Sequence, residues 1–117
     1  MDEQPDQEKQ VLQLLDEVRK EVAVLIPPAY NRFPNSFSHI FAGGYAAGYY
    51  AYSWTEMLDH DAYAWFVENG GMTRKNGQHI RDTILSQGHS KDYTVMYRNF
   101  AGRDPRVEPM LKARGLK

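Results

Sequence analysis

Hydrophobic side chains recur three or four residues apart in the first part of the chain, with charged residues between them. This spacing places the apolar positions on one side and predicts an amphipathic helix. We expect Pro27 and Pro28 to end it, because a residue that precedes a proline disfavours helical geometry. Residues 1–7, which are polar and acidic, are predicted to be a disordered lead-in. The apolar positions of the helix are Val11, Leu14 or Leu15, Val18, Val22 and Leu25.

A segment rich in proline and aromatic residues follows, from Pro27 to Ile40. Its prolines, asparagines and serines disfavour a regular element, whereas its rings offer apolar surface that burial would hold in place. We therefore expect an ordered loop rather than a flexible linker. The rings expected to be buried are Tyr30, Phe33, Phe37 and Phe41.

A long central helix is predicted to begin near Gly44 or Tyr45 and to end at about Glu68, before the sequence Asn69-Gly70-Gly71. A helix turns by about 100° per residue, so the tyrosines at positions 45, 49 and 52 would share one face. Tyrosines in such a row either pack half-buried against another helix or aim their hydroxyls into a cleft as donors. Both interpretations stay open on the residues alone.

His60 lies between Asp59 and Asp61 within this predicted helix. Adjacent helical residues face different directions, so these three side chains do not predict a metal site. A solvated acidic turn, or a local break in the helix, explains them more simply.

Three shorter helices are predicted in the rest of the chain. Thr73 or Asn76 can cap the first, which Gly88 closes, and the second runs from about Ser90 to Gly102. Asp104-Pro105 would open the last, because proline suits the first position of a helix, and Arg114-Gly115 would end it. The second helix is expected to bury Tyr93, Met96, Tyr97 and Phe100.

These patterns predict an all-α fold, a bundle of about five helices with a long central helix, in a single domain over residues 8–117. The chain has 14 basic and 15 acidic side chains, so no basic excess points to a nucleic-acid partner. It has no cysteine and no apolar run long enough to cross a membrane. Because the first residues lack the features of a secretory signal, we expect a cytoplasmic protein.

The run FSHIFAGGYAAGYYAYSWTEMLDHDAYAWF is similar to the C-terminal part of the zinc oligopeptidases of the thimet oligopeptidase, oligopeptidase A and bacterial peptidyl-dipeptidase family. The flanking segments EVAVLIPPAYNRF, TILSQGHS and NFAGRDPRVEPML agree with it, and the resemblance extends from about residue 8 to the end. It implies the C-terminal part of a catalytic domain that hydrolyses short peptides. One departure is Gly88-His89-Ser90, where the family commonly has two glycines and a serine.

The resemblance also implies roles for particular residues. Gly43 and Gly44 match a glycine loop that hinges over the cleft and lies close to bound peptide, and Tyr45 matches a tyrosine at the rim. Tyr49 and Tyr52 match tyrosines that point at the scissile bond, one of them donating to the oxyanion. His39 precedes the loop, where it is either a structural hydrogen-bonding group or part of the substrate cleft. A phenol suits the donor role because it stays protonated at neutral pH.

The zinc ligands of such enzymes are absent from this sequence. The family binds zinc through H-E-x-x-H on a helix, and this motif occurs nowhere among His39, His60, His79 and His89. The resemblance implies that the motif lies upstream, in a part that this sequence lacks. We therefore predict no metal site and no peptidase activity for the chain alone. We also expect an exposed apolar face, where the missing part would pack, and such a face usually binds a partner or aggregates.

The sequence thus predicts the substrate-binding, C-terminal portion of a zinc oligopeptidase. Its expected partners are short peptides and the missing catalytic part of the enzyme. The alternatives are a non-catalytic helical module that binds peptides or self-associates through the exposed apolar face, and an inactive truncated relic.

Overall fold

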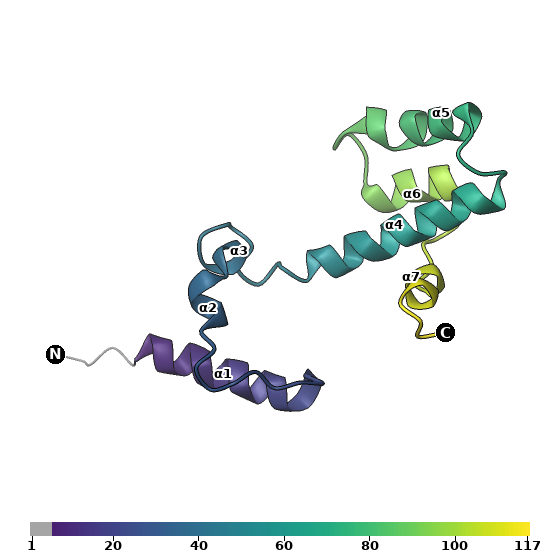
Figure 1. The fold of residues 1–117 in the computed structure, drawn as a ribbon. Coiled ribbons are helices and arrows are strands. Elements are labelled where there is room, and N and C mark those ends of the chain that lie inside the picture. Colours follow the sequence, from purple (N-terminus) through teal and green to yellow (C-terminus); the bar gives the residue numbers. More distant parts are fainter. Residues whose placement is uncertain (1–5) are drawn as a thin grey trace. The chain divides into compact units, whose positions relative to one another are not determined.

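The computed structural model describes residues 6–117, in which there are seven α-helices, one short 3-10 helix and no strand (Figure 1). The all-α prediction is confirmed. Contacts divide the chain into two compact units, Met1–Tyr49 and Tyr50–Lys117. Residues 1–5 of the predicted lead-in lie outside the described residues, whereas Asp6 caps the first helix and Gln7 begins it. The single domain over residues 8–117 stays a prediction.

Helix α1 (Gln7–Val22) is the longest element of the first unit. It ends before the prolines, at Ala23, whose backbone is extended. Continuing the helix would bring the ring of Pro27 against the carbonyl of Ala23, four residues earlier. Part of the apolar side of α1 is uncovered, since Leu14 is 60% and Val22 is 73% exposed, whereas Val11 and Leu15 are half-buried.

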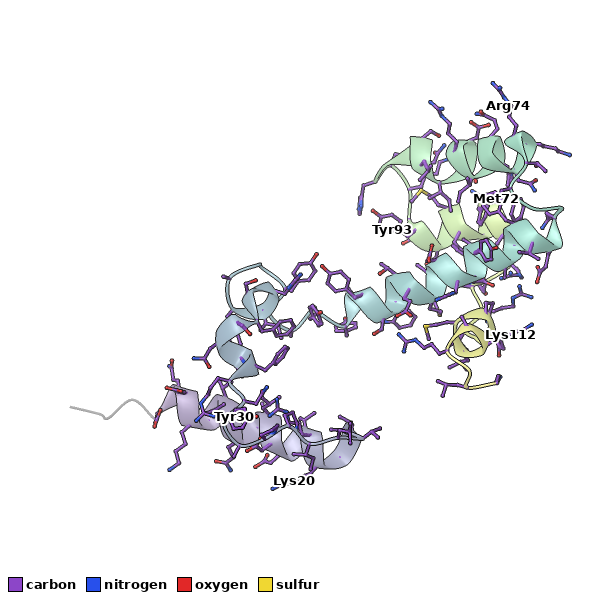
Figure 2. The ribbon with its side chains drawn as sticks, in the orientation of Figure 1. Lys20, Tyr30, Met72, Arg74, Tyr93 and Lys112 are labelled. Atoms are coloured by element: carbon purple, nitrogen blue, oxygen red, sulfur yellow. The ribbon has the colours of Figure 1, made fainter. Side chains whose placement is uncertain are left out.

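The segment after α1 contains two short helices, α2 (Phe33–Ser36) and α3 (Ser38–Phe41), where a loop was expected. The predicted burial of its rings is wrong for Tyr30, Phe33 and Phe41, which are exposed (Tyr30 is labelled in Figure 2). None of these three helices has a buried residue, so the unit offers no core in which the rings could be enclosed. Phe37 alone is half-buried, against Phe33 at 4.7 Å between ring centroids.

Helix α4 (Ala51–Glu68) opens the second unit, several residues later than predicted. Residues 42–50 are turns, bends and irregular backbone, because Gly44 has a φ of +79° and Ala46 a φ of +24°, both outside helical geometry. The prediction that three tyrosines share one helical face is therefore wrong, since only Tyr52 lies on the helix. The predicted end is correct: Asn69 caps α4 and Gly70 follows with a φ of +90°.

The core of the second unit forms where α4 meets α6 (Tyr93–Ala101), which lies between α4 and α5 (Arg74–Thr83) (Figure 1). Phe66 of α4 packs there with Tyr97 and Phe100 of α6. The 3-10 helix η1 (Leu85–Gln87) follows α5. The predicted burial of Tyr93 is wrong, because its ring is 61% exposed at the start of α6 (Figure 2). The partly buried side chains around this core are Leu58, Ala62, Trp65, Ile80, Ile84 and Ala101.

The last helix, α7 (Glu108–Ala113), begins later than the predicted Asp104-Pro105. Asp104 does not cap it, because its carboxylate accepts a hydrogen bond from Arg98 Nε at 2.6 Å. Helix α7 packs against α4, and Arg114 at its end donates to the carboxylate of Glu56. The predicted end at Arg114-Gly115 is correct.

Candidate substrate-binding loop

The chain folds back on α3 immediately after this helix ends. The N–H of Ala42 donates to the carbonyl of Ser38 at 2.7 Å, and the N–H of Tyr45 donates to the carbonyl of His39 at 3.0 Å. A further turn is closed by the N–H of Gly48, which donates to the carbonyl of Tyr45. Residues 42–49 therefore form a compact loop built on the backbone of α3.

The two glycines of this loop are required for different reasons. A Cβ on Gly43 would lie 2.9 Å from the Cα and 3.0 Å from the carbonyl oxygen of His39, which is closer than such atoms can approach. A Cβ on Gly44 would meet nothing within 4 Å, but the residue has a φ of +79°. Gly43 thus permits close packing, and Gly44 permits the reversal of the chain.

Two rings of this loop meet two rings from α3 and its N-cap, and we call Phe37, His39, Tyr45 and Tyr49 the aromatic cluster. The imidazole of His39 lies 5.8 Å from the ring of Tyr45 and 5.4 Å from that of Tyr49. The two phenol rings are 6.4 Å apart and nearly perpendicular, at 82°. Phe37 meets Tyr49 edge-on at 4.7 Å. Such edge-to-face pairs are favourable arrangements of aromatic rings.

The first unit thus brings together five of the six predicted site residues, His39, Gly43, Gly44, Tyr45 and Tyr49. Tyr52 lies in the second unit, in the first turn of α4, and is 46% exposed. The rings of Tyr45 and Tyr49 are each 38% exposed, so each is partly covered and partly open to solvent. A phenol in this setting can donate to a carbonyl or an oxyanion.

The second unit contains a buried ionic cluster that was not predicted. Asp61 is fully buried, and its carboxylate accepts five hydrogen bonds from three residues of α6 and the following loop. Burial acts to raise its pKa, but the hydrogen bonds from Arg103, Tyr97 and Arg106 together lower it to about 2. Burial and the contact with this carboxylate raise the pKa of the Tyr97 phenol. The interpretation of Asp61 as part of a solvated acidic turn is therefore wrong.

An apolar groove of ≈ 720 Å³ opens on the second unit. Its walls come from α4 and α6, with Pro105 and Ile84 at its edges. Trp54 is 59% exposed and Tyr93 is 61% exposed, so large apolar side chains border it without being covered. Other lining residues are Met57, Leu58, Ala62 and Met96.

A sequence profile of Peptidase family M3 matches residues 1–116. The chain belongs to peptidase family M3. The oligopeptidase A of Escherichia coli, a relative, is 47% identical over 113 residues, covering 97% of this chain and 17% of that protein. The dipeptidyl carboxypeptidases of Salmonella typhimurium and Escherichia coli are 55% and 56% identical over 91 residues, covering 78% of this chain and 13% of each relative.

This M3 chain therefore spans only 13–17% of the length of these relatives. The comparisons confirm the predicted resemblance to the oligopeptidase family. Among residues 6–117, no helix is long and apolar enough to cross a membrane.

The described part of this M3 chain does not fit a zinc ion, since no group of three or more His, Asp or Glu side chains in it could hold one. The best-packed histidine is His79, whose imidazole stacks on Trp65 and lies 2.9 Å from the carbonyl oxygen of Phe100. His60 lies 3.8 Å from Glu56, and His89 lies 3.3 Å from the hydroxyl of Tyr93. These contacts give each of the three histidines a structural partner.

Proposed function

We propose that this chain is the substrate-binding, C-terminal portion of a zinc-dependent oligopeptidase of family M3. The aromatic cluster is the observation that supports this most directly. It sets two partly exposed phenols beside a glycine loop, which is an arrangement suited to an extended peptide. Beside Gly44 the space is open, because a Cβ there would meet nothing within 4 Å, so no side chain at this position keeps a bound peptide at a distance.

In this proposal the tyrosines act as neutral hydrogen-bond donors. Tyr45 lies at the rim and contacts the substrate, while Tyr49 and Tyr52 direct their hydroxyls at the bond to be broken. The carbonyl oxygen of that bond gains negative charge as the carbonyl is attacked. A donor placed at such an oxyanion is worth about 3 to 4 kcal/mol to the reaction. His39 belongs to the same binding surface.

The remainder of the enzyme would supply the zinc ligands, because the described residues do not fit the metal. It would also cover the apolar groove of the second unit, whose exposed Trp54 and Tyr93 have the character of an interface. The chain alone is therefore proposed to be inactive towards peptides.

Hydrolysis of an internally quenched fluorogenic peptide tests this function. The purified chain is assayed with added zinc, first alone and then mixed with a separately expressed N-terminal part of a close M3 relative that carries H-E-x-x-H. We expect the chain alone to be inactive and the mixture to hydrolyse the peptide faster than the N-terminal part alone. A mixture made with the Tyr49→Phe chain should not show this increase. A mixture no more active than the N-terminal part alone contradicts the proposal.

A second candidate function is that of a non-catalytic helical module. It is favoured by the exposed apolar side of α1, where Leu14 and Val22 are uncovered, because such surfaces promote self-association or peptide binding. Sedimentation of the chain at increasing concentration distinguishes the two. A stable oligomer that binds peptides, together with silence in the mixing assay, favours the module. A monomer without either activity favours an inactive relic.

A further inference from the structure

The backbone of His39 contacts the loop in two ways. Its carbonyl oxygen accepts the hydrogen bond from the N–H of Tyr45. Its Cα and carbonyl also occupy the space in which a Cβ on Gly43 would lie. The position at which the chain returns after the glycine pair is therefore set by residue 39.

The side chain of His39 adds a second constraint on the same loop. Its ring is in contact distance of both phenols, at 5.8 Å from Tyr45 and 5.4 Å from Tyr49. It meets Tyr49 nearly edge-on, at 69°. Phe37, the N-cap residue of α3, packs beside them, at 5.9 Å from His39 and 4.7 Å from Tyr49 between ring centroids. Of the cluster's rings, His39 and Tyr49 each neighbour all three others, and the imidazole is the ring that contacts both phenols.

We propose that His39 is a positioning residue, which sets the separation and orientation of the Tyr45 and Tyr49 rings and acts on a bound peptide through them. The proposal rests on the proposed function, and it assigns His39 a role other than contact with the reacting atoms. Edge-to-face contacts are directional, so a flat ring at position 39 restricts where the two phenols can point. An alanine there would leave both phenols without this neighbour.

The consequence for the two hydroxyls is one of preorganisation. Donors that are already oriented lose little freedom when a substrate binds, and small displacements of such groups lower the reaction rate strongly. In this role, the imidazole of His39 acts through the packing of its flat ring and not through hydrogen bonding or proton transfer. A phenylalanine at position 39 should therefore replace it in large part.

The test is aromatic NMR on the whole 117-residue chain with labelled tyrosine and phenylalanine rings. The measured quantity is the nuclear Overhauser effect between the rings of Tyr45 and Tyr49. We expect His39→Ala to abolish it and His39→Phe to retain it. His89→Ala is the matched control, because His89 also meets a tyrosine edge-on, at 5.3 Å from Tyr93, and this change should leave the Tyr45–Tyr49 signal intact.

Two results would overturn the positioning role: a Tyr45–Tyr49 signal that persists in His39→Ala, or one that His39→Phe loses as completely as His39→Ala. In the mixing assay, the loss of turnover in the double variant His39→Ala/Tyr49→Phe should be smaller than the sum of the losses in the two single variants, because part of the effect of His39→Ala acts through the Tyr49 hydroxyl. Full additivity of the two losses argues for direct contact of His39 with substrate instead.

The proposed function can fail separately. If Tyr49→Phe leaves hydrolysis in the mixture unchanged while the NMR signal still depends on the ring at position 39, the positioning role stands and the oxyanion role of Tyr49 falls.

Discussion

Arg103 binds the carboxylate of Asp61 through both of its terminal nitrogens, at 2.6 Å and 2.9 Å, although the two residues are 42 positions apart. Arg106 adds its backbone N–H at 3.1 Å and its Nε at 3.2 Å, and the hydroxyl of Tyr97 donates at 2.7 Å. One carboxylate of α4 thus holds both α6 and the loop between α6 and α7. Because paired Arg and carboxylate groups form strong hydrogen bonds, this cluster stabilises the second unit.

Replacing Asp61 by Asn should destabilise the second unit by about 3 kcal/mol, because removing one partner of a buried ion pair leaves the other uncompensated. Urea unfolding followed by tryptophan fluorescence measures this, since Trp54 and Trp65 both lie in α4. Asp59→Asn is the matched control, because Asp59 is exposed on the same helix. Equal unfolding midpoints for the two variants would show that the cluster contributes nothing.

Acid should weaken the same unit through Asp61. Its pKa is about 2 in the folded chain against 3.8 ordinarily, so the unfolded state binds the proton more readily. The contribution is fully present above pH 4 and is lost as the pH falls through 2, and it amounts to roughly 2 kcal/mol. Unfolding free energies of the wild type and of Asp61→Asn, whose amide does not titrate, are measured between pH 6 and pH 2 and should approach each other at the acid end. Parallel curves would contradict the assignment.

The two glycines of the loop should respond differently to substitution. Gly43→Ala should displace the loop from His39, because its Cβ has no room. Gly44→Asn should be tolerated at a cost of about 1 kcal/mol or less, since asparagine adopts positive φ more readily than other side chains and the space beside Gly44 is open. Hydrogen exchange at the N–H of Tyr45, which donates to the carbonyl of His39, measures the displacement. We expect faster exchange in Gly43→Ala and an unchanged rate in Gly44→Asn. Equal rates in the two variants would contradict the different roles of the two glycines.

Tyr49→Phe and Tyr52→Phe should each lower kcat in the reconstituted enzyme about 100-fold or more, the loss typical of a missing oxyanion donor, with a smaller change in KM. Tyr50→Phe is the control, because Tyr50 lies between them in sequence and is 66% exposed. Steady-state kinetics with the fluorogenic peptide separate the two constants. An equal loss in Tyr50→Phe, or a change confined to KM, would argue for a general packing or binding effect.

Zinc should bind to the isolated chain no more tightly than to a control protein with surface histidines. The reason is that the described residues hold no group of three potential ligands, and a structural zinc site takes four. Calorimetric titration measures the affinity and the stoichiometry. Stoichiometric binding in the submicromolar range would sink this expectation, and His60→Ala would then be the first variant to examine.

The ends of helices could be predicted where a glycine just after the last helical residue determines them. Gly70 after α4 and Gly102 after α6 both adopt positive φ, as their positions in the sequence indicate. The start of α4 was not predictable from periodicity, because the glycines at 43, 44 and 48 and the turn at Ala46 override an otherwise helical pattern. The tyrosines at 45 and 49 consequently meet through a loop instead of along a helix.

The burial of Asp61 could not be predicted from its neighbours in sequence. Asp59 and Asp61 look alike in the run LDHDA, yet only Asp61 meets cations and a phenol, and these lie 36 to 45 residues further along the chain. The paired arginines at 103 and 106 were the one available signal, since two cations three residues apart suit a shared carboxylate. The resemblance singles out His39, Tyr45 and Tyr49 as candidate site residues, but the contact of His39 with both phenols depends on the geometry of the loop.

The buried carboxylate of Asp61 makes helix α4 depend on the segment after α6, which supplies Arg103 and Arg106. A protease that removed everything after Ala101 would take away one short helix and no residue of the aromatic core. It would also take away both arginines, leaving Asp61 dependent on Tyr97 alone. The carboxylate of Asp61 would then have to bind a proton or become exposed to water. Such a truncation should therefore destabilise the packing of α4 within the second unit.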